Sequence, residues 1–288
     1  MEILSQLILN GVIAGALYAL MALGFNLIYG VTRFFNLAHG VLAAIGGYAF
    51  FTLSKTLGLN IYLGAAIGVA VAGLAGYGFD RLVYSTLRKR KASNLVLLVA
   101  SLGVFTTAQA ALSILFTSNF QTLSSGEAGG SALSLFGGVV TRTQLVIIFS
   151  SIASMLGLAA LLKGTMFGKA VRAISDDEEV ARMVGINTGR VTGYVFFIGS
   201  AIAGFAGILA GFDTGIQPTM GMGLLLKGVI ASIIGGVGNI YGGVLGAFLL
   251  GLVENFGIWK IPGEWKDAVS FVLLIVFLIF RPQGIMKR

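Results

Sequence analysis

A series of long apolar stretches, separated by short polar turns, limits the folds open to this chain. The stretches cover approximately residues 3–29, 40–54, 60–83, 94–116, 143–162, 191–212, 222–236, 240–257 and 266–281. A helix needs about 20 apolar residues to cross a bilayer, so the stretches at 40–54, 222–236 and 266–281 are short. The sequence therefore predicts an all-α polytopic transmembrane bundle of about eight or nine spans, with some short segments half-buried or interrupted.

The composition excludes a water-soluble domain. Hydrophobic residues make up 57% of the chain and charged residues 10%, whereas soluble domains carry about 25% charge. The 43 glycines against 3 prolines fit transmembrane helices that pack closely. We expect residues 1–288 to form a single transmembrane domain, with small-residue pairs such as Gly11/Gly15, Gly64/Gly68 and Gly207/Gly211 as close-packing faces.

The basic residues predict an orientation rather than a nucleic-acid partner. The net charge is +8, but the lysines and arginines lie in short turns between apolar stretches, which favours the inner surface of a membrane. Most of the basic residues lie inside if four segments are cytoplasmic: the turn near Arg33, residues 82–93, residues 163–190 and the C-terminal tail. The residues left for the outer side or the interior are Lys55, Arg142, Lys227, Lys260 and Lys266. We therefore expect a multi-pass protein of the cell (inner) membrane, with its N-terminus outside and its C-terminus cytoplasmic.

Sites for catalysis, metals and cofactors are not expected. The chain has no cysteine and only one histidine, His39, which argues against disulfides and a conventional metal site. It lacks the glycine-rich loop with Lys and Ser/Thr that cradles phosphates, so it does not use ATP by itself. The glycine-rich run at 236–242 has the wrong spacing for a dinucleotide site.

The polar segment at 163–190 stands out against its apolar surroundings. Val171, Ile174, Met183 and Val184 recur at roughly helical spacing among charged residues, which predicts a short amphipathic helix or helix pair. Ser175, followed by acidic residues, is a candidate helix start, and Gly185 is a candidate helix end. The segment is either a solvated connector or a docking surface for a soluble partner.

A short internal likeness relates residues 36–44 to residues 239–247. Chance similarity in a chain rich in Gly, Ala, Val and Leu is one explanation. The other is a pair of half-buried turns in repeated halves, which marks substrate paths in transporters. His39, in the first of these turns, either satisfies backbone groups or lines the path.

Several motifs are spread along the chain: residues 165–173, residues 177–187, residues 36–40, Lys227 with residues 235–238, and the tail at 281–285. Together they resemble the permeases of branched-chain amino acid ABC transporters over essentially the whole chain, and the absence of long insertions resembles the shorter of the two permease subunits.

This resemblance implies partners rather than catalysis. A homologous second permease would complete the pore, two cytoplasmic ATPases would bind ATP and drive it, and a soluble binding protein would deliver substrate from outside. Residues 163–190 would carry a coupling helix. The residues at or beside the ATPase contact would be Gly168, Arg172, Glu178, Glu179, Ala181, Arg182, Gly185, Ile186 and Asn187.

The predicted translocation path follows from the same resemblance together with the internal likeness. Its candidate residues are Asn36, His39, Gly40, Lys227, Gly235, Gly236, Gly238 and Asn239. The function so implied is inward transport of branched-chain, apolar amino acids by alternating access. The alternatives are a related ABC permease for urea or short amides, a stand-alone secondary carrier or channel, and a membrane-embedded enzyme or scaffold.

Overall fold

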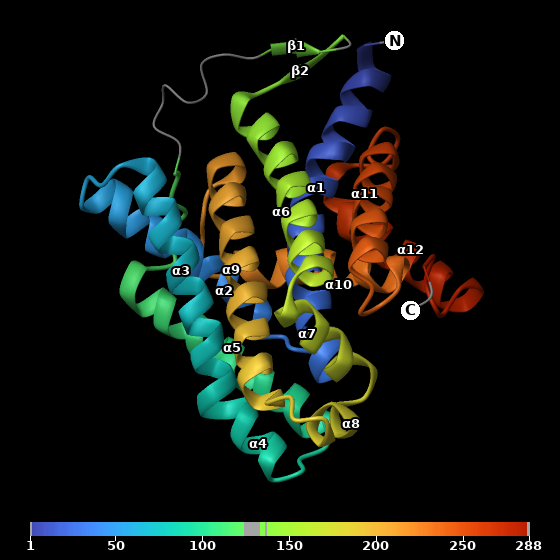
Figure 1. Ribbon diagram of the computed structural model, residues 1–288. Coiled ribbons are helices and arrows are strands. Elements are labelled where there is room, and N and C mark those ends of the chain that lie inside the picture. The colour runs from blue at the N-terminus through green and yellow to red at the C-terminus, as the bar shows by residue number, and fades with distance from the viewer. Residues whose placement is uncertain (1, 124–132, 136, 287–288) are drawn as a thin grey trace.

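The computed structural model describes residues 2–123, 133–135 and 137–286, and these are almost entirely helical (Figure 1). The α-helices are α1 Glu2–Thr32, α2 His39–Phe50, α3 Ile61–Phe79, α4 Ser85–Lys89, α5 Asn94–Phe116, α6 Arg142–Gly164, α7 Met166–Asp176, α8 Glu178–Met183, α9 Thr188–Thr214, α10 Met220–Gly235, α11 Ile240–Gly257 and α12 Lys266–Phe280. Short π-helices at Phe51–Thr56 and Asp80–Tyr84 continue α2 and α3, and a 3₁₀ turn at Gly263–Trp265 precedes α12. Strands β1 Leu133–Leu135 and β2 Gly138–Val140 form an antiparallel hairpin with Leu133 opposite Val140.

Six helical segments of the described chain are long and apolar enough to cross a membrane. They are Ile3–Thr32, Ile61–Lys89, Asn94–Phe116, Arg142–Gly164, Thr188–Thr214 and Ile240–Gly257. The all-α membrane bundle is as predicted, but the expected count of eight or nine spans is not confirmed. The three stretches that were short in the sequence fold as the short helices α2, α10 and α12.

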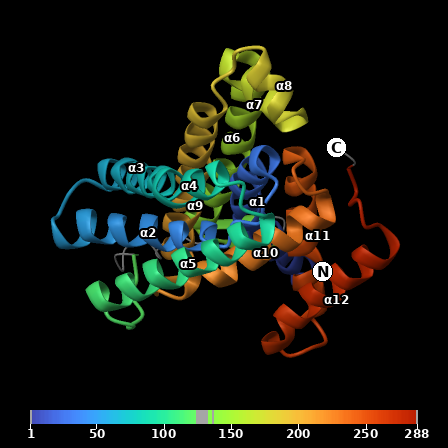
Figure 2. The same cartoon turned by 90° about the horizontal axis from the view of Figure 1, so that it is seen from below.

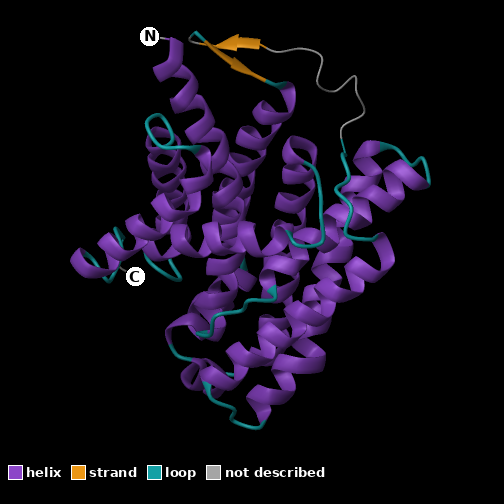
Figure 3. Cartoon of the chain, turned by 180° about the vertical axis from the view of Figure 1, so that it is seen from behind, coloured by secondary structure: helices purple, strands orange, loops and turns teal. Residues whose placement is uncertain are grey.

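Helix α10 lies across the long helices rather than alongside them (Figures 1 and 3). A Cβ added at Gly228 would meet Met21 of α1, and one added at Gly235, near the end of α10, would meet Gly242 of α11. Gly242 adjoins Gly243, which faces Asn26 of α1. These contacts join α10 to α1 and α11, and its residue count alone does not reveal the crosswise path.

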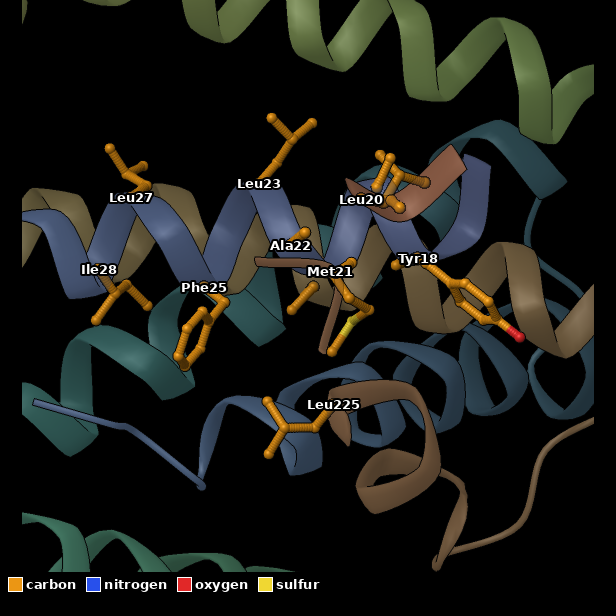
Figure 4. Packing of buried hydrophobic residues seen from close by; sticks show 14 of the residues in the cluster. Tyr18, Leu20, Met21, Ala22, Leu23, Phe25, Leu27, Ile28 and Leu225 are labelled. Atoms are coloured by element: carbon orange, nitrogen blue, oxygen red, sulfur yellow. The ribbon is translucent and has the colours of Figure 1, made fainter. Parts of the chain in front are cut away.

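Helix α1 forms the centre of the bundle. It contacts α6, α7, α9, α10 and α11, and between Ala16 and Ile28 nearly every side chain is buried. Figure 4 shows apolar side chains leaving α1 in several directions, with Leu225 of α10 on the side toward which Met21 and Phe25 extend. A helix that is apolar all round belongs in the interior.

The predicted small-residue faces pack as expected. Gly11 and Gly15 face Leu252 and Phe248 of α11, with added Cβ atoms 2.9 and 2.8 Å from the Cα atoms of those residues. Helix α11 is therefore antiparallel to α1. Gly64 and Gly68 face the α2 segment, while Gly207 faces Ala43 and Gly211 faces Leu123 and Ile216.

The outer helices leave apolar side chains exposed, as expected for contact with lipid. Examples are Leu74 of α3, Ile114 of α5, Phe149 of α6 and Phe280 of α12. The β-hairpin lies at the end of the bundle where α1 begins, and Gln6 of α1 bonds the backbone of Val139 there. Helices α4, α7 and α8 lie at the opposite end (Figures 1 and 2). Because that end carries the basic turns, we call it the cytoplasmic end and its opposite the outer end; the orientation itself stays a prediction.

Candidate functional site

The charged segment folds as two helices, α7 and α8, at the cytoplasmic end. Thr165 caps α7 by accepting a hydrogen bond from the Gly168 amide at 3.0 Å. Gly168 lies so close to the carbonyl group of Leu162 that a larger residue would collide there. Val171 and Ile174 are buried against the bundle. Helix α7 is therefore a packed part of the structure rather than a loose connector.

Side-chain hydrogen bonds join α7 to the end of α1. The Ser175 hydroxyl donates to the carbonyl oxygen of Gly30 at 2.7 Å, and the Arg33 guanidinium donates to the carbonyl oxygen of Ser175 at 2.6 Å. The Arg172 guanidinium donates to the carbonyl oxygen of Leu162 at the end of α6. These hydrogen bonds connect α7 to α1, the central helix, and to α6.

Helix α8 begins and ends with defined caps. The predicted cap at Ser175 was wrong, because that hydroxyl bonds α1 instead. Asp177 caps α8, its Oδ1 accepting from the amides of Glu179 at 2.8 Å and Val180 at 3.0 Å. The predicted end at Gly185 is confirmed, since this glycine has a φ of 89° and the Ile186 amide bonds the carbonyl oxygen of Ala181 at 3.0 Å.

The apolar residues of the segment divide between two faces. The sequence pattern grouped Val171 and Ile174 with Met183 and Val184, but the first two face the bundle while the last two are exposed. Met183 is 78% exposed, and Val180 beside it is also exposed. We refer to Val180, Met183 and Val184 as the α8 apolar patch.

The predicted coupling residues have different structural positions. Glu178, Glu179 and Arg182 are exposed around the α8 apolar patch, with an Arg182–Glu178 ion pair at 2.7 Å. The remaining ones shape the segment: Gly168 and Ala181 are buried, Arg172 anchors α7, Gly185 and Ile186 end α8, and Asn187 caps α9.

The first predicted half-buried turn lies beside α3 and α5. Asn36 is buried, and its Oδ1 accepts hydrogen bonds from the Ala38 amide at 3.1 Å and the Tyr84 hydroxyl at 3.0 Å. His39 is fully buried and touches Gly24 of α1. Gly40 lies against the backbone of Gly221 in α10. These contacts place the turn within the packed interior.

The second predicted turn joins α10 to α11. Gly235 packs on Gly242, and Gly236 approaches Met286. The Gly238 amide bonds Oδ1 of Asn26 at 2.8 Å, and Asn239 caps α11 through the Gly242 amide at 3.1 Å. The tail covers this turn, because the amides of Ile285 and Met286 each donate at 2.9 Å to the carbonyl oxygens of Ile234 and Gly235.

One cavity brings the two predicted sets together. It has a volume of about 350 Å³ and lies between α1, α6, α7 and α11 at the cytoplasmic end. Arg172, from the coupling set, lines it together with Gly238 and Asn239, from the path set. Asn36, His39 and Gly40 do not line it.

Lys227 lies apart from both turns, in a cluster of charged and polar groups. Its Nζ is 2.6 Å from Oε1 of Glu254, 2.6 Å from the Ser270 hydroxyl and 2.7 Å from Oδ1 of Asp267. The hydroxyl of Tyr18 donates to the other oxygen of Glu254 at 2.8 Å. No sequence motif predicts this pairing, although opposite charges in two separate apolar stretches are a usable indication. The described residues contain no group of three metal-binding side chains.

The fold and the segment at 163–190 define a polytopic helical membrane protein from which a charged helix pair, α7 and α8, projects at one end. The profile of the branched-chain amino acid transport system / permease component family matches residues 7–278. The chain belongs to this family.

Individual relatives agree over nearly the full chain. It is 34% identical to the high-affinity branched-chain amino acid transport system permease protein BraD of Pseudomonas aeruginosa, over 98% of this chain and 95% of the relative. It is 32% identical to LivH of Escherichia coli, with the same coverage. Among solved structures, PsaBC from Streptococcus pneumoniae has a TM-score of 0.50 at 13% identity, covering 98% of this chain and 93% of that one, which supports the fold alone.

Proposed function

We propose that this chain is a membrane-spanning permease subunit of an ABC importer that passes branched-chain and similar apolar amino acids inward. The family and the names of its relatives support the substrate class. The further subunits are a homologous permease that completes the pore, two cytoplasmic ATPases and an extracytoplasmic substrate-binding protein. The N-terminus faces outside and the C-terminus faces the cytoplasm.

The observation that carries this proposal is the exposed surface of α8. Val180, Met183 and Val184 form an apolar patch, and Glu178, Glu179 and Arg182 surround it. Apolar anchors within a charged rim are the arrangement that packs into a groove of a partner protein and fixes its register. The α8 apolar patch therefore enters a groove on an ATPase.

The connections of α7 and α8 provide a route for the ATPase movement. Asp177 follows α7 directly and caps α8, while Ser175 and Arg33 join α7 to α1. Closure of the ATPases displaces α8, and α7 transmits the displacement to α1 and to the cavity lined by Arg172, Gly238 and Asn239. Transport then follows alternating access, in which the outward-facing and inward-facing states have different affinities for the substrate or for the ATPases.

The test is ATP-dependent uptake of L-leucine by proteoliposomes that contain the complete transporter and its binding protein. Replacing both Glu179 and Arg182 with alanine removes two exposed rim charges, and of the bundle contacts it removes the long hydrogen bond of 3.5 Å from the Arg182 guanidinium to the Thr188 hydroxyl of α9. Uptake should fall by about tenfold, equivalent to roughly 1.4 kcal/mol at the interface. Arg90→Ala, another exposed charge at the cytoplasmic end, is the matched control and should transport normally. Normal uptake by the double variant would overturn the docking role of α8.

Competition in the same assay tests the substrate. L-Isoleucine and L-valine should reduce uptake of labelled L-leucine, whereas urea and short amides should not. Inhibition by urea, with no inhibition by L-valine, would contradict the proposed substrate class.

A further inference from the structure

A second cavity, of about 420 Å³, lies toward the outer end of the bundle. Its volume falls within the range of about 300–1,000 Å³ that small-molecule sites occupy. Helices α1, α6, α9, α10, α11 and α12 all contribute to its lining. None of the residues predicted from the sequence for the translocation path lines it.

Two opposite charges from different helices border this cavity: Asp213 at the end of α9 and Lys266 at the start of α12. Within the described part of the chain, the Asp213 carboxylate receives a single hydrogen bond, from the Gln144 amide at 3.3 Å. The Lys266 ammonium is 3.8 Å from Glu254, which already bonds Lys227 and Tyr18. Both charged groups therefore retain capacity for a ligand.

A buried amide adds an oriented polar group. Asn255 is only 4% exposed and lines the cavity. Its Nδ2 donates to the carbonyl oxygen of Gly251 at 2.8 Å, while its Oδ1 accepts no hydrogen bond from the described residues. Because Asn255 lines the cavity, this oxygen is free to accept a hydrogen bond from a bound donor.

The rest of the lining is mixed: an apolar part is formed by Ile13, Ala14, Leu17, Ala210 and Leu224, and a polar part by Asn10, Tyr18, Gln144 and Thr214. A metal ion would find a single carboxylate here, whereas hard cations take six or more oxygen ligands, about two of them commonly from carboxylates. A simple anion would meet Asp213. A ligand with one positive end, one negative end and a hydrocarbon body matches the complete set of groups.

We infer that this cavity is a binding site for a zwitterionic apolar amino acid. Asp213 and the Asn255 oxygen receive the ammonium group, Lys266 receives the carboxylate, and the side chain lies against Ile13, Leu17 and Leu224. This inference rests on the proposed function and extends it: the permease itself recognises the amino acid after the binding protein releases it.

The absence of cysteine from the sequence allows a direct test. Ala14→Cys places a small reporter on the wall of the cavity, and its reaction with a maleimide is followed on this chain by mass spectrometry, in the complete transporter. L-Leucine at nine times its dissociation constant should slow modification about tenfold. Ile3→Cys, on the same helix but exposed and outside the cavity, is the matched control and should react at an unchanged rate.

Ligand analogues and variants separate the two charges. Leucinamide lacks the carboxylate and 4-methylpentanoate lacks the ammonium, so each should protect at least about tenfold less well than L-leucine. Asp213→Asn and Lys266→Met, each combined with Ala14→Cys, should lose protection by L-leucine to a similar extent. Glu264→Gln and Lys260→Met remove exposed charges near the start of α12 that do not line the cavity, and should retain it.

The outcomes distinguish this site from the proposed function. A complex that transports L-leucine but shows no protection overturns the site and leaves the function. Protection without transport supports the site and contradicts the function. Equal protection by L-leucine and both analogues overturns recognition of the zwitterion, and this result does not depend on the folding of any charge variant.

Discussion

Two ion pairs of nearly equal length have different roles in this protein. Lys227 and Glu254 are 2.6 Å apart with side chains 12% and 0% exposed, while Arg182 and Glu178 are 2.7 Å apart with side chains 66% and 47% exposed. Breaking a buried pair leaves an uncompensated charge, whereas an exposed pair contributes little to stability. Charges inside the bundle therefore maintain its architecture, and charges on α8 remain available for a partner.

The buried pair also organises neighbouring helices. Lys227 of α10 bonds Glu254 of α11 and Asp267 and Ser270 of α12, and Glu254 bonds Tyr18 of α1. Four helices thus meet at one cluster. The exposed pair, in contrast, lies within the single helix α8.

The largest predicted effect comes from removing the buried acid. Glu254→Ala leaves Lys227 with fewer partners in a largely buried position and should lower stability by about 3–5 kcal/mol. Thermal unfolding of the purified complex in mild detergent measures this loss. The double variant Lys227→Met/Glu254→Leu removes both charges and should be more stable than Glu254→Ala. Unfolding of Glu254→Ala at the temperature of the unmodified protein would contradict the architectural role of the pair.

A smaller effect is expected where backbones touch inside the bundle. Gly207→Ala adds a methyl group that collides with the carbonyl oxygen of Ala43, at a cost of about 1–3 kcal/mol. In the matched change Gly157→Ala in α6, the added methyl group would meet no neighbouring atom within 4 Å. It should be neutral or stabilise the helix by up to about 1 kcal/mol. Equal unfolding temperatures for the two variants would show that contact at Gly207 does not limit packing.

At the end of α8, a glycine substitution should act locally. Gly185 has a φ of 89°, so Gly185→Ala should cost about 1–2 kcal/mol at this turn. Hydrogen exchange of the α8 amides should accelerate about tenfold, since each 1.4 kcal/mol is a factor of ten, while exchange in α1 stays unchanged. Faster exchange in α1 as well would mean that the turn stabilises the bundle.

The exposed pair gives the smallest expected change in stability. Glu178→Ala should alter stability by about 0.5 kcal/mol or less, because exposed i,i+4 pairs contribute only this much. Leucine uptake by the complete transporter should nevertheless decrease. Thermal unfolding and uptake are measured on the same preparation, and a large loss of thermal stability would mean that the pair is structural.

Much of the helical architecture could be predicted because it depends on local patterns. Apolar stretches predicted membrane helices, small-residue pairs predicted close contacts, and Gly185 predicted a helix end. The number of spans could not be predicted reliably. Helix α10 is apolar enough to suggest a span, and its crosswise path depends on contacts of Gly228 and Gly235 with distant helices.

The candidate site was predictable only in part. The charged segment at 163–190 is conspicuous in an apolar chain, but which of its apolar residues face outward depends on the packing of α7 against α1. The pairing of Lys227 with Glu254 joins residues on different helices, so no short sequence pattern contains it. The predicted role of Asn36 and His39 in a path stays a prediction, while both residues lie in the packed interior.

The bonds from the tail to α10 have a consequence for the biogenesis of the protein. The carbonyl oxygens of Ile234 and Gly235 receive the amides of Ile285 and Met286, which leave the ribosome only after α11 and α12. Until then, the end of α10 lacks these backbone partners while it is already at the membrane. The turn at the end of α10 therefore gains its full set of backbone hydrogen bonds only after the last helices have been synthesised.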